Sequence, residues 1–330
     1  MDGQSPRQRY GSGGKTRDHY MPKDIYIGNT DHDWFRFCKE NSPLREVNFW
    51  QPSRQHFKAM HEGGIFFFRC KAPINKIGGF GTLASAGVAS VATCWDELGI
   101  SNGTRSKEEF LERVSKYNKN VKVDEQTLVG FKILGDPVFL DEEHWIDLPA
   151  DWSQNIVTGK SYNSISMEGE RLLTFYRSHQ SSAFRDSKFD DFGFSDHPVP
   201  ACTMGQPQKV RSGQARFKFA LLDAYEARCA VTGSSVEAFL EAAHIIPFSE
   251  SMDNSVNNGI LLRCDIHTLF DRGLLNINGN YLVELSDKFF ELYPDDIIYR
   301  GLHGQKISLP KKASWHPSLN NLAKRIASGG

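Results

Sequence analysis

The chain has almost no net charge. Its 330 residues carry 39 Lys and Arg against 40 Asp and Glu, which leaves a formal net charge of −1. The strongly basic balance of a protein that coats nucleic acid is therefore absent. Because unspecific affinity for nucleic acid comes mainly from neutralised phosphates, any such contact must depend on a local patch.

Long apolar runs and paired cysteines are also missing. No apolar stretch reaches about 18 residues, so we expect no membrane span, and no secretory signal is visible at the N-terminus. The wide spacing of the cysteines along the chain predicts free thiols in a reducing cytoplasm. Without a C-x-x-C pair, a zinc ribbon is not expected. The 6 cysteines are Cys38, Cys70, Cys94, Cys202, Cys229 and Cys264.

What the chain does contain predicts two soluble α+β domains. The apolar content is 39% and the charged content 24%, as in globular proteins, and the length exceeds that of one ordinary domain of about 100–200 residues. Residues 1–23 are polar and glycine-rich, so we expect a disordered or non-native tail, with Met21 as a candidate natural start. A basic arm that touches DNA is the alternative.

The front half combines short strands with helices. Turn residues bound each apolar stretch, and Ser106 with Glu109 forms a capping box before a helix. A small β-barrel with helical decoration is therefore predicted for residues 24–166. A helical and acidic linker (167–205) follows, and a second domain (206–330) opens on an amphipathic helix expected to stop near Gly233. The predicted strands span residues 24–31, 63–73, 76–88 and 127–140, and the predicted helices span 33–41 and 106–117.

Polar residues gather between Leu240 and Gly273. We expect a strand over 240–248, a loop rich in Asp, Asn and Ser, a helix over 260–273, and then a hairpin with an Asn-Gly turn. His267 and Asp271 are four residues apart, so they share one helix face and could ligate one divalent cation. His244 ends the strand and could face the same spot, where an imidazole and a metal suffice for phosphodiester hydrolysis.

A structural role competes with that interpretation. An i,i+4 His–Asp pair also stabilises helices without any metal, and a single histidine is more often structural than catalytic. The ordered set of His244, Asn258, His267 and Asp271 favours the catalytic interpretation.

The segment "CAVTG … LEAAHIIP … NNGILL … DIHTLFDRG" resembles the HNH (ββα-metal) endonucleases. The resemblance implies that His244 is the general base, that Asn258 holds the loop, and that His267 binds the metal. Asp271 stands where some members have a second helical ligand. The expected cofactor is a divalent ion, Mg²⁺ or Mn²⁺, with Co²⁺ and Ni²⁺ as alternatives.

The chain departs from the HNH pattern at two places. Ala243 stands where many members have a ligand, so the metal is expected to keep more waters, as Mg²⁺ and Mn²⁺ do. The cysteines do not reproduce the spacing of a structural zinc site, and none is predicted. Strand alternation puts Glu241 on the face away from His244, which favours a structural role. Arg263 and Arg272 could contact phosphate, or could be solvated helix charges.

Residues 24–162 resemble a PUA-superfamily module of the EVE or SRA-like kind. The segments that carry the resemblance are "GNTDHDWF", "VNFWQPS", "GGIFFFRCKAP", "IGGFG" and "DWSQNIVTGKSY". Such modules flip a modified base into an aromatic pocket, although each aromatic residue could equally pack in the core. Trp50 is the favoured wall, because Pro52 and polar neighbours suggest a loop. The candidate pocket residues are Asn29, Trp34, Asn48, Phe49, Trp50, Gln51, Ser53, Lys160 and Tyr162.

Together the two resemblances imply a modification-dependent (type IV) restriction endonuclease of the bacterial cytoplasm. Its expected partner is double-stranded DNA that contains 5-methylcytosine or 5-hydroxymethylcytosine. One nuclease site per chain implies a homodimer or sequential nicking. Two alternatives stay open. The sensor could read another mark (phosphorothioate, a hypermodified base or a nucleotide signal), or the chain could be a reader without catalysis.

Overall fold

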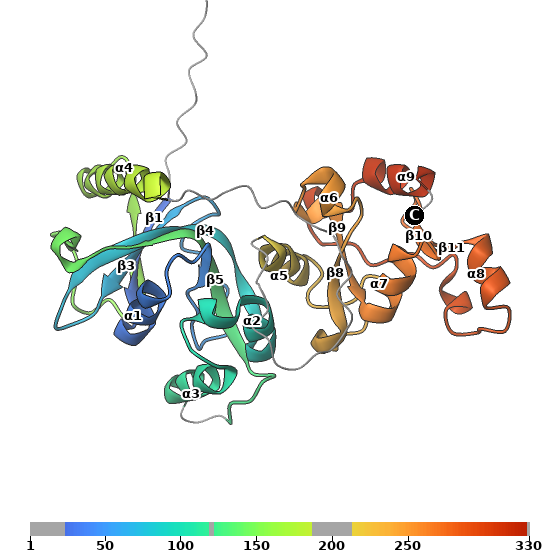
Figure 1. Ribbon diagram of the computed structural model, residues 1–330, viewed down its shortest axis with the longest axis horizontal. Coiled ribbons are helices and arrows are strands. Elements are labelled where there is room, and N and C mark those ends of the chain that lie inside the picture. Colours follow the sequence, from blue (N-terminus) through green and yellow to red (C-terminus); the bar gives the residue numbers. More distant parts are fainter. Residues whose placement is uncertain (1–23, 119–121, 187–212, 329–330) are drawn as a thin grey trace, which may run out of the picture.

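The computed structural model describes residues 24–118, 122–186 and 213–328, without the side chains of 181–186. One half contains a large sheet with helices α1 to α4, and the other contains a small ββα unit with helices α5 to α9 (Figure 1). The α+β class predicted from the sequence is confirmed. No helix in these ranges is both long and apolar enough to cross a membrane. The predicted tail (1–23) and residues 187–205 of the predicted linker lie outside the described residues, whereas residues 167–186 of that linker form a helix.

Seven strands form the sheet of the first half. Along the sheet the strand order is β2-β5-β4-β3-β1-β7, with β6 paired to β4. The pair β1–β3 is parallel and the other pairs are antiparallel. The register of β4 against β5 shifts twice, so this glycine-rich strand is bulged. The strands are β1 (Asp24–Thr30), β2 (Glu46–Asn48), β3 (Ile65–Cys70), β4 (Lys76–Ser90), β5 (Leu128–Phe139), β6 (Ile146–Asp147) and β7 (Gly159–Asn163).

Side-chain caps begin all four helices on this sheet, and the cap of α4 is Ser166, whose Oγ accepts from the Gly169 N–H at 3.1 Å. Asp31 accepts from the first backbone N–H groups of α1, Ser90 caps α2, and Ser106 accepts from the Glu109 N–H of α3. The Glu109 carboxylate accepts from the Arg105 N–H, so the predicted capping box is only half formed. Helix α2 was not anticipated from the sequence. The helices are α1 (His32–Glu40), α2 (Val91–Leu98), α3 (Lys107–Tyr117) and α4 (Met167–Asp186).

The second half is built around a ββα unit. Strand β8 (Leu240–His244) pairs antiparallel with β9 (Gly259–Arg263), and α7 (Cys264–Asp271) follows directly. The predicted helix over 260–273 is therefore wrong at its start. Residues 260–262 are fully buried strand, and a short run of Ile and Leu has no periodicity that separates a buried strand from a helix.

The remaining elements enclose this unit. The predicted hairpin is confirmed, with Leu275 opposite Leu285, but its connection spans residues 278–282 and the positive φ falls on Tyr281 and not on Gly279. Helix α5 ends at Ala224 and not near Gly233, because Glu226 and Ala227 adopt positive φ angles. The elements are α5 (Gln214–Ala224), α6 (Phe248–Ser251), β10 (Leu275–Ile277), β11 (Val283–Leu285), α8 (Asp287–Leu292) and α9 (Leu319–Ala327).

One hydrophobic cluster continues across the predicted domain boundary. It joins residues of β4, β5, α2 and α3 to α5 and the ββα unit. Phe131 of β5 and Phe219 of α5 lie 4.3 Å apart between ring centroids. Two ion pairs flank this contact, Arg216–Glu46 at 2.9 Å and Lys218–Glu97 at 2.7 Å. Helix α5 thus packs against the sheet on one side and strands β8 and β9 on the other (Figure 1).

Candidate functional site

His244 ends β8 and is clamped by an aromatic ring. The imidazole stacks on Phe217 of α5, with ring centroids 3.9 Å apart and planes at 12°. Gly259 lies opposite His244 in the strand pair. A Cβ at this glycine would come within 2.5 Å of the Phe217 ring. The glycine is therefore required for the aromatic ring to reach the imidazole.

The surroundings of His244 favour a neutral imidazole. Burial lowers the pKa of His244, and the contact with Asn254 opposes this only in part. The Asn254 Oδ1 atom lies 2.9 Å from Nε2. Because an amide oxygen can only accept, Nε2 carries the proton in this contact and the lone pair lies on Nδ1. The side chain is thus held in the form that a general base needs. Asn254 was not anticipated, since its loop contains several asparagines.

Asn258 spans the loop that follows His244. Its side chain is fully buried. The Oδ1 atom accepts from the Ile246 N–H at 3.0 Å, while Nδ2 donates to the carbonyl oxygens of Ile246 (3.1 Å) and Asp253 (3.0 Å). Asn321 of α9 donates to the same Oδ1 atom. One side chain therefore ties both ends of the loop together, which is the geometry that the predicted supporting role requires.

His267 and Asp271 meet on α7, and Glu241 joins them from β8. The Nε2 atom of His267 lies 3.2 Å from Asp271 Oδ2. Its Nδ1 atom lies 2.7 Å from Glu241 Oε2. The expectation that Glu241 faces away from the site is wrong, because its long side chain reaches the imidazole. Strand alternation fixes where Cβ points and not where a flexible carboxylate ends.

These donors suit a divalent ion with few protein ligands. The described residues contain no group of three or more His, Cys, Asp and Glu side chains arranged to hold a metal. Two neighbouring ligands of an octahedral Mg²⁺, each at about 2.1 Å, lie about 3.0 Å apart. The separation of 3.2 Å between His267 Nε2 and Asp271 Oδ2 fits such a pair. Glu241 on Nδ1 would orient the ring, as carboxylates often do behind a metal-binding histidine.

Three other predicted positions lie around this site. Ala243 is fully buried in the core. Arg263 is engaged twice by Asp265, with both N–O distances 2.6 Å, so a phosphate would have to compete with that carboxylate. Arg272 is exposed just after α7. Of the two arginines, the geometry leaves Arg272 more accessible to a phosphate.

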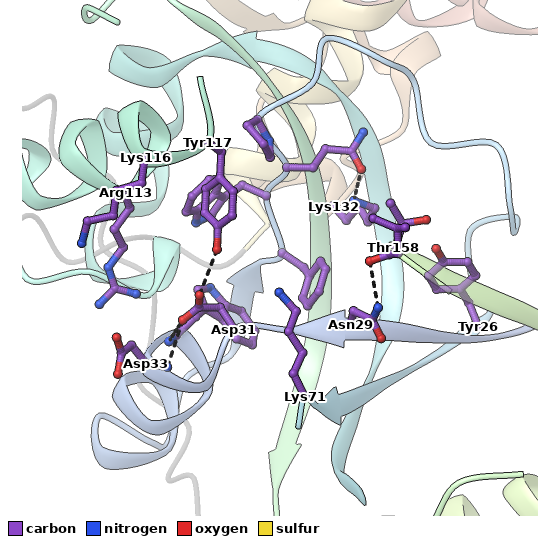
Figure 2. Close-up of a pocket in the computed structure, with 16 residues that line it drawn as sticks. Tyr26, Asn29, Asp31, Asp33, Lys71, Arg113, Lys116, Tyr117, Lys132 and Thr158 are labelled. Carbon is purple, nitrogen blue, oxygen red and sulfur yellow. Dashed lines mark hydrogen bonds between the residues drawn. The ribbon is translucent and has the colours of Figure 1, made fainter. Parts of the chain in front are cut away.

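A second site lies in the first half, as a cavity of about 200 Å³ (Figure 2). Its walls come from β1, the start of α1, the segment after β2, α3, β5 and the turn before β7. Trp34 is almost buried and donates from Nε1 to the Asn48 carbonyl. Trp50 packs edge-on against Phe110. The predicted pocket residues that line the cavity are Asn29, Trp34, Phe49, Trp50 and Gln51.

Four predicted pocket residues do not line this cavity. Asn48 is fully buried and donates to Asn102, so it supports the wall from behind. Ser53 is exposed and accepts from Gln51. Lys160 and Tyr162 both contact Asp151, and the Tyr162 ring packs in the core cluster that includes α4 residues.

Asn29 positions the cavity mouth. Its Nδ2 atom donates to the carbonyl oxygens of Ile156 and Val157, both at 2.8 Å, and its Oδ1 atom accepts from Arg69 at 2.6 Å. The amide is thus already bonded to protein on both ends. Val157, which it holds, is 84% exposed and lines the cavity.

Sequence reasoning missed the most unusual residue of the cavity, Lys132. It lies in β5, is 3% exposed, and lines the cavity. Its Nζ atom donates to Gln51 Oε1 at 2.8 Å. Burial lowers the pKa of Lys132 to about 7. The signal in the sequence was a single lysine inside the apolar run "LVGFKIL", where a charged residue is unfavourable unless it has a role.

Comparisons with known proteins agree with the nuclease site. Residues 229–278 match the family described as HNH endonuclease (HNH_2), so this part of the chain is an HNH endonuclease domain. Such nucleases work with a divalent metal. No curated protein matches the chain.

Two kinds of solved structure are similar to the chain. The ASCH protein from Zymomonas mobilis is 13% identical, with 46% of this chain and 93% of that chain covered and a TM-score of 0.31. A modification dependent TagI restriction endonuclease is 11% identical, with 86% and 75% covered and a TM-score of 0.28. At these low TM-scores neither similarity is evidence for an activity of this chain.

Proposed function

We propose that the chain is a modification-dependent DNA endonuclease. The cavity of the first half takes up a modified cytosine flipped out of double-stranded DNA, and the HNH domain cuts the phosphodiester backbone. The observation that carries the proposal is one of architecture. An aromatic cavity lies in the sheet against which α5 packs, and the same helix contacts the catalytic imidazole.

His244 acts as the general base of the cleavage step. Its Nδ1 lone pair accepts a proton from the attacking water, while the Nε2–H group keeps its hydrogen bond to Asn254 Oδ1. Asn258 keeps the following loop, and with it the imidazole, in place. His267 and Asp271 would hold the divalent ion, and Glu241 would orient the His267 ring through its contact with Nδ1. When bound, this ion stabilises charge on the phosphate and on the leaving oxygen. The products are 5′-phosphate and 3′-hydroxyl ends.

The cavity supplies what recognition of a flipped base needs. A methyl or hydroxymethyl group is read only after the base leaves the stack. Phe49 and Trp50 offer aromatic faces or edges at the cavity wall, and stacking of a base on such a side chain contributes about 1–3 kcal/mol. Val157 at the mouth is exposed and apolar, which suits a contact with the bases left in the duplex.

Cleavage of matched DNAs tests the proposal. Substrates that contain cytosine, 5-methylcytosine, 5-hydroxymethylcytosine or its glucosylated form are incubated with Mg²⁺ or Mn²⁺. The wild-type chain is compared with His244→Ala and with the control His32→Ala, whose side chain is exposed on α1. Cutting of modified DNA alone, lost only in His244→Ala, is the expected result.

The other outcomes separate the alternatives. Equal cutting of all substrates would leave an HNH nuclease and remove the sensor. No cutting with Mg²⁺, Mn²⁺, Co²⁺ or Ni²⁺, together with selective binding of modified DNA, would point to a reader without catalysis. Selective cutting of phosphorothioate DNA would replace the base mark with a backbone mark.

A further inference from the structure

Lys132 places a nearly inaccessible amine at the wall of the cavity. Its Nζ atom lies 2.8 Å from Gln51 Oε1, 5.4 Å from the ring centre of Phe49 and 4.9 Å from that of Phe57. Among the residues that the structure describes, it forms no ion pair with a carboxylate. The amine therefore has one neutral acceptor and two aromatic faces as its surroundings.

The acidic residues of the cavity are already engaged elsewhere. Asp31 caps α1 and accepts from the Tyr117 hydroxyl at 3.1 Å. Asp33 pairs with Arg36. Figure 2 shows Asp31 and Asp33 near the start of α1, away from Lys132, whose Nζ atom contacts Gln51. No acidic group of the cavity thus serves as the partner of Lys132.

An amine in this position discriminates between ligands by their acceptors. A buried donor that loses its water without gaining a partner destabilises the complex, whereas a hydrogen bond to a charged donor is among the stronger ones in proteins. A bare methyl group against Nζ would displace water and offer no acceptor. A hydroxymethyl oxygen would accept one hydrogen bond, and a carboxylate would form an ion pair in a poorly solvated space.

We propose that Lys132 is a specificity-determining residue, and that the cavity takes a base whose modification carries an oxygen acceptor in preference to one that carries only a methyl group. The inference rests on the proposed function, since it assumes that the cavity reads a base. Within that function it ranks the substrates. An acidic substituent binds most tightly, a hydroxymethyl group follows, and a methyl group is weakest.

Binding of three duplexes tests this ranking. Each carries one 5-methyl-, 5-hydroxymethyl- or 5-carboxylcytosine at the same position, and affinity for the full chain is measured by fluorescence anisotropy in EDTA, so that no cutting occurs. We expect the hydroxymethyl and carboxyl duplexes to bind about tenfold or more tightly than the methyl duplex. Lys132→Met, which keeps the length of the side chain, should bring the three affinities together.

Two further variants keep the test sharp. Lys71→Met removes one of the two exposed amines of the cavity wall, the second being Lys116, and should leave the ranking unchanged. Lys132→Gln keeps a donor without a charge, so it should lose the advantage of the carboxyl duplex over the hydroxymethyl one. It also replaces Lys132→Met if that variant fails to fold.

Several results would overturn the inference. These are a methyl duplex that binds as tightly as the others in the wild type, a ranking that survives in Lys132→Met, or an equal loss for all three duplexes in that variant. The same bases are also tested as free deoxynucleotides. If only the free nucleotides show the Lys132-dependent ranking, the inference on the cavity stands and the proposed sensing of DNA fails.

Discussion

At the scale of single residues, the carboxylate of Glu241 is the least expected part of the nuclease site. It lies 2.7 Å from His267 Nδ1, and this hydrogen bond is the main cause of the lowered pKa of Glu241. A negative partner on Nδ1 fixes the ring so that Nε2 points to Asp271. Removal of such a partner typically weakens metal binding by about 10–100-fold.

We therefore expect Glu241→Gln to weaken metal binding without unfolding the chain. The amide can still contact the imidazole but carries no charge. Calorimetric titration with Mn²⁺ should show a dissociation constant raised by about 10-fold or more, with a parallel rise in the Mn²⁺ concentration needed for cleavage. Glu291→Gln, at an exposed position of α8, is the matched control. An unchanged dissociation constant would show that Glu241 has only a structural role.

Lys132 gives the folded chain a pH dependence of known sign. Burial lowers its pKa from 10.5 to about 7, so between these values the unfolded state binds more protons than the folded state. Stability then rises with pH across that window. The cost of the buried charge is complete below about pH 7 and absent above about pH 10.5. The charged groups that line the same cavity are Asp31, Asp33, Lys71, Arg113 and Lys116.

Lys132→Met should accordingly be more stable than the wild type at low pH, because methionine has no charge to desolvate. Urea unfolding at about pH 6 and about pH 10 measures the difference, and the gap should shrink at the higher value. The other cavity charges are present in both proteins and cancel in the comparison. A gap that does not change with pH would mean that Lys132 keeps its ordinary pKa.

The contact between His267 and Asp271 could be predicted from the sequence because their spacing is local. His267 and Asp271 share a helix face by periodicity alone, and their contact on α7 follows. A lysine inside an apolar run marks Lys132 as unusual, but its place in a cavity could not be predicted, since that cavity is assembled from six parts of the chain that are distant in sequence. The same limit explains why Lys160 and Tyr162 were assigned to the pocket. Both are near β1, but they contact Asp151 instead.

At the scale of elements, the ββα unit depends on a glycine beside the stacked rings of His244 and Phe217. Strand β9 begins at Gly259, which faces His244 across the strand pair and the Phe217 ring of α5. The sequence alone placed the start of β9 in a helix, since Ile and Leu suit either element when both are buried. Only the pairing with β8 decides for the strand.

Gly259→Ala should therefore disturb both stability and cleavage. The added Cβ would meet the Phe217 ring at 2.5 Å, so the ring has to move and the imidazole that it clamps moves too. We expect a loss of about 1–3 kcal/mol in the free energy of unfolding and a larger fractional loss of cleavage than of DNA binding. Gly279→Ala is the control, because nothing lies within 4 Å of its Cβ. Equal behaviour of the two variants in melting and cleavage assays would contradict this account.

At the scale of the whole molecule, the sheet of the first half and the nuclease domain share a core through α5. Successive side chains of a strand point to opposite faces, and β5 shows this directly. Lys132 faces the cavity, while its neighbour Phe131 packs on Phe219 of α5. Two residues before Phe219, Phe217 stacks on His244. A ligand that shifts β5 on the cavity side is thus connected to the His244 imidazole through two ring contacts.

If these ring contacts transmit the effect of a ligand in the cavity to the nuclease domain, Phe219→Leu should make cleavage less dependent on that ligand. Leucine keeps the site apolar but is smaller, so Phe131 loses part of its contact. We expect affinity for a modified duplex to stay within about twofold of the wild type, because the cavity itself is untouched. The ratio of cleavage rates on modified and unmodified DNA should fall. Phe289→Leu replaces a buried aromatic ring of α8 in the nuclease half, and it controls for the loss of stability that such a substitution causes. If both variants keep the wild-type ratio, the shared core only holds the halves together, and selectivity must come from DNA binding alone.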